Sequence, residues 1–508
     1  MIARRNLQPS GTLLALAFML GGCTVGPDFQ RPAPPPVERY DHEQITATPA
    51  TPGLADGQAQ HFDVARDIPA DWWRLFRSPQ LNDLVAQALR NNPDLQAAQA
   101  ALRQAHEATL AQRGSAFPAV SVGVNAQRQQ DPSGSLAPTP SNNASLYSLI
   151  TPQVSVSYAP DLFGLNRRTA ESLAAQEQAS RYQMLAARVS LSTNVVQAAV
   201  QGAALRAQIE ASRQVIDIDT RMVEILRYQL HKGYADRLAL AAQETQLAQA
   251  QAALPPLLTQ QAQQRHALAA LLGMASSQAP VVDFDLDTLK LPTDLPLSLP
   301  STLVRQRPDV LQAQAQLHAA NAQVGVAIAN RFPSFQIGAN VGSSALKTSQ
   351  LFTAGTGFWN LTGALTTPIF EGGALLHAER GAQAAYDQAA AQYRGTVVSA
   401  FQNVADTLSA LEHDAQALHA AADADAAARV TLDLTQARYR AGYADYLTLL
   451  GAQQSSQQAR IALAQARAAR LTDTAALFQA LGGGWWQDET TAGTTGPHDD
   501  PRRPPDEH

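Results

Sequence analysis

Apolar and polar residues alternate strictly in four short stretches of the chain, at residues 120–127, 153–158, 335–342 and 359–366. In the first stretch, Val120, Val122 and Val124 alternate with small polar residues. Side chains alternate between the two faces of a strand, and a tilted strand of about ten residues crosses a bilayer. The pattern predicts four membrane-spanning strands with one apolar and one polar face. Taken singly, each stretch also fits a half-buried strand of a soluble sheet.

Each pair of strands is followed by stretches that predict unusually long helices. No Pro occurs from Leu165 to His231, a length of roughly 100 Å at about 1.5 Å per residue. The partner helix is expected from Asp236 to Leu272, with a kink or break at Pro255-Pro256. The other expected helices are a second long pair at 374–441 and 446–481, and shorter helices before the strands at 94–112 and 309–330.

The second half of the chain repeats the first. Phe117-Pro118 returns as Phe332-Pro333, and Gly233-Tyr234-Ala235-Asp236 returns as Gly442-Tyr443-Ala444-Asp445. Matches this far apart and in the same order indicate a duplicated structural unit. Each unit then holds one helix, two strands and one long helical hairpin.

Two repeats supply four strands, which are too few to close a barrel, since about eight is the lower limit. An open sheet edge in lipid leaves backbone groups unpaired at several kcal/mol each. If the strands span a membrane, the barrel must therefore be shared between subunits. Two copies would give eight strands around an interior filled by side chains, whereas three would give twelve strands with room for a channel.

The N-terminus has the features of a targeting segment. Arg4-Arg5 precede a short apolar run from Leu13 to Leu20, which is too short for a membrane span. The run ends at Cys23, the only cysteine, in a sequence that resembles the lipobox of bacterial lipoproteins. The resemblance implies acylation of Cys23, with chains such as palmitate, and Thr24 is compatible with sorting to the outer membrane. An ordinary secretory signal with an incidental cysteine is the alternative.

The chain is expected to divide into five parts. Pro32 and Pro34 open a Pro-rich stretch reaching Gly57, which predicts an extended tether outside any core. The end of the chain is rich in acidic residues, Pro, Thr and Gly, which predicts disorder. The parts are a signal peptide at 1–22, a lipidated tether at 23–70, the first repeat at 71–291, the second repeat at 292–486 and a disordered tail at 487–508.

Composition argues against several classes of function. The formal net charge of -6, with only 16% charged residues, gives no electrostatic case for nucleic acid. Asp283, Asp285 and Asp287 alternate, but the Gly and Glu of a calcium-binding EF-hand loop are lacking. No zinc-protease, phosphate-loop or serine-hydrolase motif occurs. We therefore expect no enzyme activity, no cofactor and no metal.

Several short motifs resemble those of the outer-membrane efflux factors, the TolC/OprM/NodT family. The resemblance covers nearly the whole chain after the signal peptide, and its motifs are specific jointly rather than singly. The motifs are Cys23-Thr24-Val25-Gly26-Pro27-Asp28-Phe29, Asp71-Trp72-Trp73, Arg307-Pro308-Asp309-Val310, Arg438-Tyr439-Arg440-Ala441-Gly442 and Ala480-Leu481-Gly482-Gly483-Gly484-Trp485.

This resemblance implies an α+β membrane protein that forms a homotrimer. Three chains would share a 12-stranded β-barrel, continued by a long α-helical barrel with a mixed equatorial belt. The implied function is the outer-membrane exit duct of a tripartite pump that exports small toxic compounds such as drugs. Its partners would be a periplasmic adaptor, an inner-membrane transporter of the RND type and outer-membrane lipid. The alternatives are a lipid-anchored structural coiled coil and, within the family, a duct for protein secretion.

The family also implies a gate at the periplasmic tips of the helical hairpins. Asp residues brought together there by threefold symmetry would form an acidic ring that attracts cations. Asp236 and Asp445 also suit helix capping, and the two roles are compatible. The family often has acids where this chain has Thr448 and Gly451, which weakens the case for an acidic constriction. The gate candidates are Tyr228, Tyr234, Asp236, Arg237, Tyr439, Tyr443, Asp445 and Tyr446.

Overall fold

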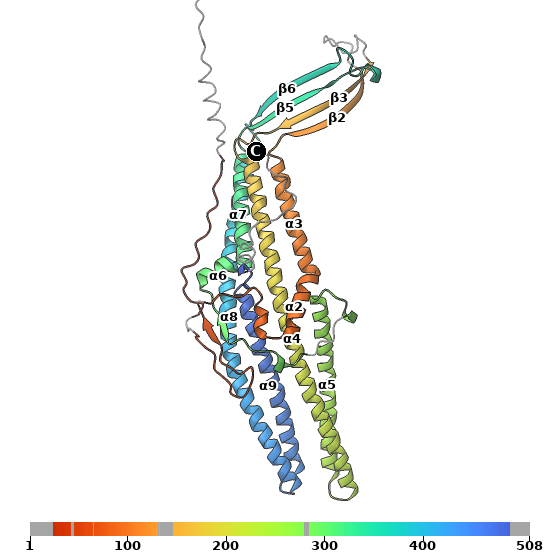
Figure 1. Ribbon diagram of the computed structural model, residues 1–508, viewed down its shortest axis with the longest axis vertical. Coiled ribbons are helices and arrows are strands. Elements are labelled where there is room, and N and C mark those ends of the chain that lie inside the picture. The colour runs from red at the N-terminus through yellow and green to blue at the C-terminus, as the bar shows by residue number, and fades with distance from the viewer. Residues whose placement is uncertain are drawn as a thin grey trace, which may run out of the picture. The chain divides into compact units, whose positions relative to one another are not determined.

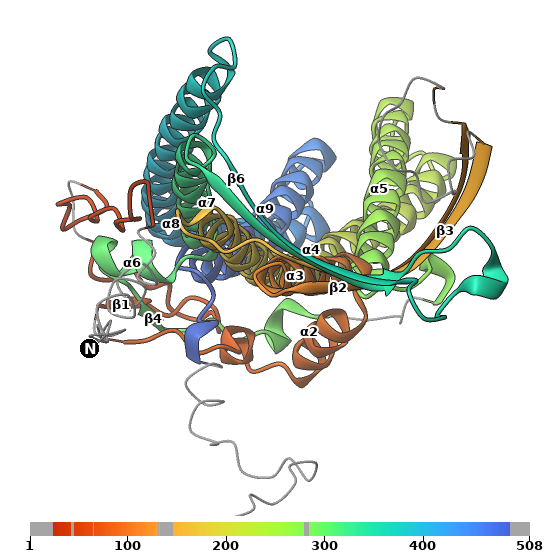
Figure 2. The ribbon, with the colours of Figure 1, turned by 90° about the horizontal axis from the view of Figure 1, so that it is seen from above.

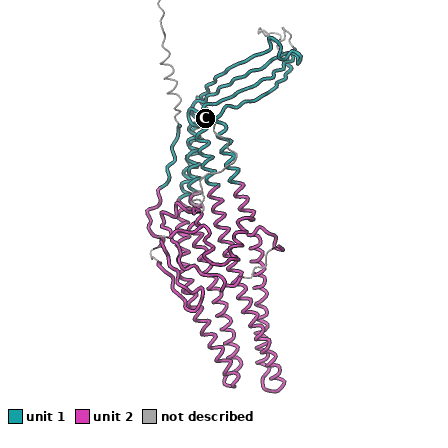
Figure 3. The backbone as a smooth tube through the Cα atoms, viewed as in Figure 1, with its two compact units in different colours: residues 1–32, 101–180, 313–393 teal, residues 33–100, 181–312, 394–508 magenta. Residues whose placement is uncertain are grey.

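A computed structural model describes residues 24–41, 45–64, 66–130, 132, 146–278 and 284–487. Its backbone forms two compact units, shown in Figure 3: residues 1–32, 101–180 and 313–393 make unit 1, and residues 33–100, 181–312 and 394–508 make unit 2. Each unit takes segments from both halves of the chain. The signal peptide, Cys23, Asp283 and all but the first residue of the predicted tail lie outside the described residues.

Unit 1 contains a four-stranded antiparallel sheet with the order β2-β3-β5-β6 (Figures 1 and 2). The register places Val122 opposite Val154, Val154 opposite Val341, and Val341 opposite Trp359, so these side chains share one face. The four alternating strands are confirmed. Their bounds are Ala119–Gln130 for β2, Leu146–Tyr158 for β3, Ser334–Ser343 for β5 and Gly357–Thr366 for β6.

The two faces of this sheet differ in chemistry. Val122, Val341 and Trp359 on the apolar face are all exposed. On the other face Asn340 Nδ2 donates to Asn360 Oδ1 at 2.8 Å. A soluble sheet would bury its apolar face, so this exposure fits a sheet that faces lipid on one side and water on the other.

The long helices are confirmed close to their expected bounds. α4 (Leu165–His231) and α5 (Arg237–Leu271) form one hairpin, and α8 (Ala374–Arg440) and α9 (Tyr446–Ala480) form the other (Figure 1). The shorter helices are α3 (Pro93–Gly114) and α7 (Pro308–Ala329). None of the helices in the described part of the chain has the length and apolarity that a membrane crossing requires.

Of the kink or break expected at Pro255-Pro256, the break is wrong, because α5 continues through both residues. Each Pro removes one backbone N–H donor, so the carbonyls of Gln251 and Ala252 lose their helical partners. Both residues are exposed, and water can bond to these carbonyls instead.

Several short elements in unit 2 were not predicted from the sequence. β1 (His61–Asp63) pairs in parallel with β4 (Asp294–Pro296). These strands are too short to show a period. The remaining elements are the helices α2 (Pro79–Asn91) and α6 (Pro300–Gln306) and the 3-10 turns η1 (Trp72–Phe76), η2 (Ser276–Gln278), η3 (Leu286–Thr288) and, in unit 1, η4 (Thr348–Gln350).

The predicted tether is not free of the core along its whole length. Thr48, Asp56 and Gln60 are buried, the last two completely. The reason is Arg470 on α9, which is 0% exposed and donates from Nη2 to Thr48 Oγ1 at 3.0 Å and to Gln58 O at 2.6 Å. A buried guanidinium needs such acceptors, and this segment supplies them.

The carboxyl groups of Asp56 and Asp414 lie close to Arg470. Asp414 on α8 is hydrogen-bonded to Asp473 on α9, and burial together with this second acid raises the pKa of Asp414 to about 7. Arg470 and His413 act in the opposite direction but do not cancel the shift. Near neutral pH a substantial fraction of Asp414 is therefore protonated.

We predict that Asp414→Asn stabilises the protein at pH 8 but not at pH 4. An unfolded Asp ionises near pH 3.9, whereas native Asp414 ionises near 7. The native state binds the extra proton between these values, so stability falls as pH rises through this window. The neutral amide of the Asn side chain does not ionise, so the variant avoids this fall in the free energy of unfolding. The gain at pH 8 is about 1–2 kcal/mol after allowance for partial exposure. Thermal unfolding at both pH values measures it, and equal gains at pH 4 and pH 8 would contradict it.

Candidate functional site

The end of the first hairpin carries four of the gate candidates. Tyr228 and Tyr234 are exposed, and Lys232 Nζ lies 5.6 Å from the centroid of the Tyr228 ring. Gly233, with φ +77°, ends the first helix of the hairpin. Asp236 begins the next helix, because its Oδ1 accepts from Ala239 N at 2.7 Å, and Arg237 is the first helical residue.

The second hairpin ends in the same way but packs differently. Asp445 Oδ1 accepts from Thr448 N at 2.8 Å, and hydrogen bonding to Thr448 holds the pKa of Asp445 below its usual value. Tyr439 and Tyr446 meet edge to face, with ring centroids 6.2 Å apart. Tyr443 is 86% exposed, whereas Tyr446 is only 7% exposed. Both Asp residues therefore cap helices.

Tyr446 belongs to a buried polar cluster that the sequence did not reveal. Burial, with nearby Asp219 and Tyr439, raises the pKa of the Tyr446 hydroxyl, which has no hydrogen-bond partner among the described atoms. Asp219 on α4 accepts from Gln243 Nε2 of α5 at 3.0 Å. Burial raises the pKa of Asp219, and its Oδ2 is likewise unpartnered. The cluster joins α9 of the second repeat to both helices of the first.

Polar contacts also connect the two hairpins within unit 2. Gln454 Nε2 donates to Gln246 Oε1 at 2.5 Å, and Arg460 Nη1 donates to Gln214 Oε1 at 3.0 Å. A typical hydrogen bond of this kind contributes only about 0.5–1.5 kcal/mol net. Each of these contacts therefore adds little to the stability of the fold.

Two of the sequence motifs meet in unit 2. Trp72 is fully buried and stacks on Phe478 of α9, with centroids 5.0 Å apart. The Gly-rich turn after α9 then brings Trp485 Nε1 to Gln306 O at 2.7 Å. The three glycines of this turn have φ values of +98°, +72° and +72°, which only glycine adopts readily.

We predict that Gly484→Ala is strongly destabilising. A Cβ there would lie 2.5 Å from both Ile68 O and Pro69 O, and the φ of +72° adds backbone strain. We expect a loss of about 2–4 kcal/mol, combining overpacking and strain. Gly451→Ala is the matched control, because Gly451 lies in α9 with open space around it, and helix propensity predicts a small gain there. Equal thermal midpoints for the two variants would contradict this reading.

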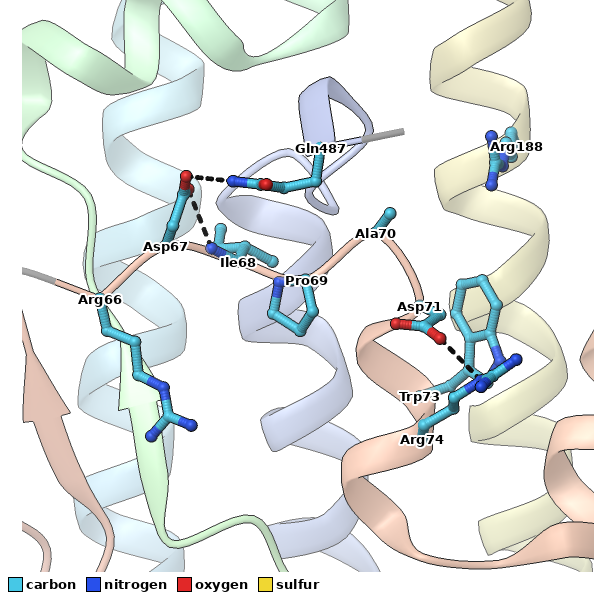
Figure 4. Close-up of a pocket in the computed structure, with 10 residues that line it drawn as sticks. All are labelled: Arg66, Asp67, Ile68, Pro69, Ala70, Asp71, Trp73, Arg74, Arg188 and Gln487. Carbon is cyan, nitrogen blue, oxygen red and sulfur yellow. Dashed lines mark hydrogen bonds and ion pairs between the residues drawn. The ribbon is translucent and has the colours of Figure 1, made fainter. Parts of the chain in front are cut away.

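A solvent-facing hollow beside this turn offers no catalytic arrangement among the residues that line it (Figure 4). Asp67 accepts hydrogen bonds from Ile68 N, Trp486 Nε1 and Gln487 Nε2, and Asp71 is paired with Arg74 at 2.7 Å. Both acids are therefore engaged in holding the fold. Among the described residues there is also no group of three or more His, Cys, Asp and Glu side chains placed to hold a metal ion.

A two-faced sheet with an exposed apolar side, joined to long helical hairpins, defines a membrane-channel subunit. Comparison with known proteins agrees. The sequence profile described as "Outer membrane efflux protein" matches residues 84–274 and 299–483. The chain therefore belongs to the outer membrane efflux protein family.

Similar proteins support the same assignment. The antibiotic efflux pump outer membrane protein ArpC and the toluene efflux pump outer membrane protein TtgC, both of Pseudomonas putida, are each 31% identical over 482 residues, covering 94% of this chain and 96% of the relative. The solved structure of the outer-membrane channel OprN matches with a TM-score of 0.80 at 27% identity, covering 91% of this chain and 100% of OprN. The protein is an outer-membrane channel of efflux pumps and not an enzyme.

Proposed function

We propose that three copies of the chain form the exit duct of a tripartite pump. The observation that carries the proposal is the register of the sheet, which gathers its apolar side chains on one exposed face. β2 and β6 lie at the edges of this sheet and pair with no further strand in the described part of the chain. Because open edges in lipid cost several kcal/mol per unpaired group, neighbouring copies pair with them, and three copies give twelve strands around a channel.

The partners proposed are a periplasmic adaptor and an inner-membrane transporter of the RND type, which supplies the energy. The cargo proposed is small toxic compounds, including drugs, in keeping with the names of the antibiotic- and toluene-efflux relatives. Removal of residues 1–22 and acylation of Cys23 anchor the duct to the outer membrane. The sparse charge of the chain suits passage of chemically varied solutes.

The gate proposed is at the hairpin ends. The exposed Tyr234 and Tyr443 and the capping residues Asp236 and Asp445 lie at the two turns, and Tyr446 lies behind them in the buried cluster. The two turns differ in the residue that follows the cap, which is Arg237 in one and Tyr446 in the other. This difference supports unequal roles for the two hairpins, with the second held to the first through its buried ring.

We predict that the purified protein is a trimer that conducts ions in planar bilayers, and that its loss makes cells more sensitive to drugs. Native mass spectrometry, single-channel recording and drug accumulation measure the three parts. A monomer without conductance that mild detergent extracts as a peripheral lipoprotein would instead support a structural coiled coil. Trimers with conductance, normal drug resistance and a defect in protein export would identify a secretion duct.

A further inference from the structure

An extended strap, residues 24–31, runs along one face of α7 within unit 1. The partners on α7 are spaced four, three and four residues apart, which is the spacing of one helix face. Phe29 stacks on His318 with ring centroids 4.3 Å apart. The contacting pairs are Gly26 with Gly325, Pro27 with Asn321, Phe29 with His318 and Arg31 with Gln314.

Arg168 of α4 fixes the start of this strap. Its side chain is 4% exposed and donates from Nε to Val25 O at 3.1 Å and from Nη2 to Gly26 O at 3.2 Å. The same Nη2 lies 2.8 Å from Asp28 Oδ1, and Nη1 lies 2.7 Å from Glu171 Oε2. A buried guanidinium with a partner at every nitrogen holds its acceptors in one geometry. The strap is therefore a built part of unit 1.

The N-terminal end of the strap, at Thr24 and Val25, lies at the junction of β3 and α4. Val25 N donates to Phe163 O at 3.2 Å. Gly164 has φ +84°, and a Cβ at this position would lie 2.6 Å from Thr24 Cγ2. Thr24 therefore packs directly against the backbone of Gly164. Phe163 stacks on Phe332, which directly precedes the Pro333–β5 segment, with centroids 4.9 Å apart. Thr24, the first described residue after Cys23, therefore lies beside this aromatic pair.

We propose that this junction is a seat for acyl chains, occupied by the lipid carried on Cys23. The inference rests on the acylation proposed above. Phe332 is exposed and Phe163 half-buried, next to strands whose apolar face is exposed. Aromatic side chains at the end of membrane strands lie at the interface, where they contact acyl chains. The strap holds the attachment point in place, so the attached lipid packs at a fixed position rather than mixing freely with bulk lipid.

Photo-crosslinking of the attached lipid tests the seat on the full-length protein. Cells are grown with a diazirine-bearing fatty acid, the purified channel is irradiated, and adducts are mapped by mass spectrometry. The expected adducts join the lipid of Cys23 to peptides that contain Phe163 and Phe332. In Arg168→Gln, we expect Cys23 to stay acylated while these adducts fall several-fold. Arg167→Gln is the matched control, since the Arg167 side chain is half exposed and pairs with Asp161.

The outcomes separate the seat from the acylation itself. If the intact mass shows no lipid on Cys23, both proposals are overturned. If Cys23 is acylated but its adducts lie elsewhere, or are unchanged in Arg168→Gln, only the seat is overturned. In Cys23→Ser, phospholipid from the bilayer could still form adducts at Phe163 and Phe332. If these adducts were as abundant as in the wild type, bulk lipid would be the occupant of the seat. Asp28→Asn, a milder loosening at an exposed residue, is expected to give an intermediate loss and guards against misfolding of Arg168→Gln.

Discussion

Arg470→Met is expected to lower the free energy of unfolding by about 3–5 kcal/mol, because one partner of a buried charged network is removed. Arg470 is 0% exposed and donates to Thr48, Gln58 and Gln60. Without it, the amide oxygen of Gln60 loses a donor in a buried site and the carbonyl of Gln58 loses one in a part-buried site. The thermal unfolding midpoint in detergent is expected to fall by several degrees.

The pH dependence of this defect gives a sharper test. Arg470 lowers the pKa of Asp414, so its loss raises that pKa further above the ordinary value. At pH 4 Asp414 is neutral and needs no positive partner, so the defect should be smaller there than at pH 8. A defect of the same size at both pH values would show that only packing and the neutral hydrogen bonds matter.

Arg460→Met is the matched control. Arg460 lies on the same helix ten residues earlier, and its hydrogen bond to Gln214 at 3.0 Å is exposed. Such an exposed bond contributes at most about 1 kcal/mol, so its loss is expected to be small. If Arg460→Met and Arg470→Met were equally destabilising, the buried network would not be what holds residues 48–60 against α9.

The sequence predicted those parts of the fold that local pattern determines. The absence of Pro, with only one Gly at Gly202, predicted the extent of α4, and alternation predicted all four strands of the sheet. The break that Pro255-Pro256 suggested did not occur, because local preference does not record exposure, and exposed carbonyls bond to water instead. The ends of helices follow from local chemistry, whereas the effect of a proline inside a helix depends on its surroundings.

Contacts between distant residues could not be predicted in this way. Arg470 and Thr48 are 422 positions apart, and nothing in the Pro- and Thr-rich composition around Thr48 indicates a buried guanidinium. Asp219 and Gln243 lie inside long helices that contain many polar residues, so neither stands out. The turn residues Asp236 and Asp445 were visible because a cap is a local feature. The capping role of the turn residues could therefore be predicted, whereas the buried neighbourhood of Tyr446 could not.

Tyr446→Ala is expected to raise channel conductance in planar bilayers by about ten- to a hundredfold. Truncating a buried aromatic side chain typically costs about 3–5 kcal/mol. Here the ring packs against Tyr439 and lies beside Asp219 of the other hairpin. We take about 1.4–2.8 kcal/mol of this packing energy to be present only in the closed state, in which the hairpins are together. Its loss lowers the population of the closed state relative to the open state by about ten- to a hundredfold.

Two further variants distinguish the effect of the Tyr446 ring from the effect of its hydroxyl and from the effect of the exposed turn. Tyr446→Phe keeps the packing and removes a buried hydroxyl without a described partner, so the closed state should be at least as stable and conductance no higher than in the wild type. Tyr443→Ala changes a ring that is 86% exposed on the same turn and should have the smaller effect. High conductance in Tyr443→Ala with wild-type conductance in Tyr446→Ala would place closure at the exposed tip and not in the buried cluster. An increase in Tyr446→Phe would show instead that the hydroxyl finds its partner in the closed trimer.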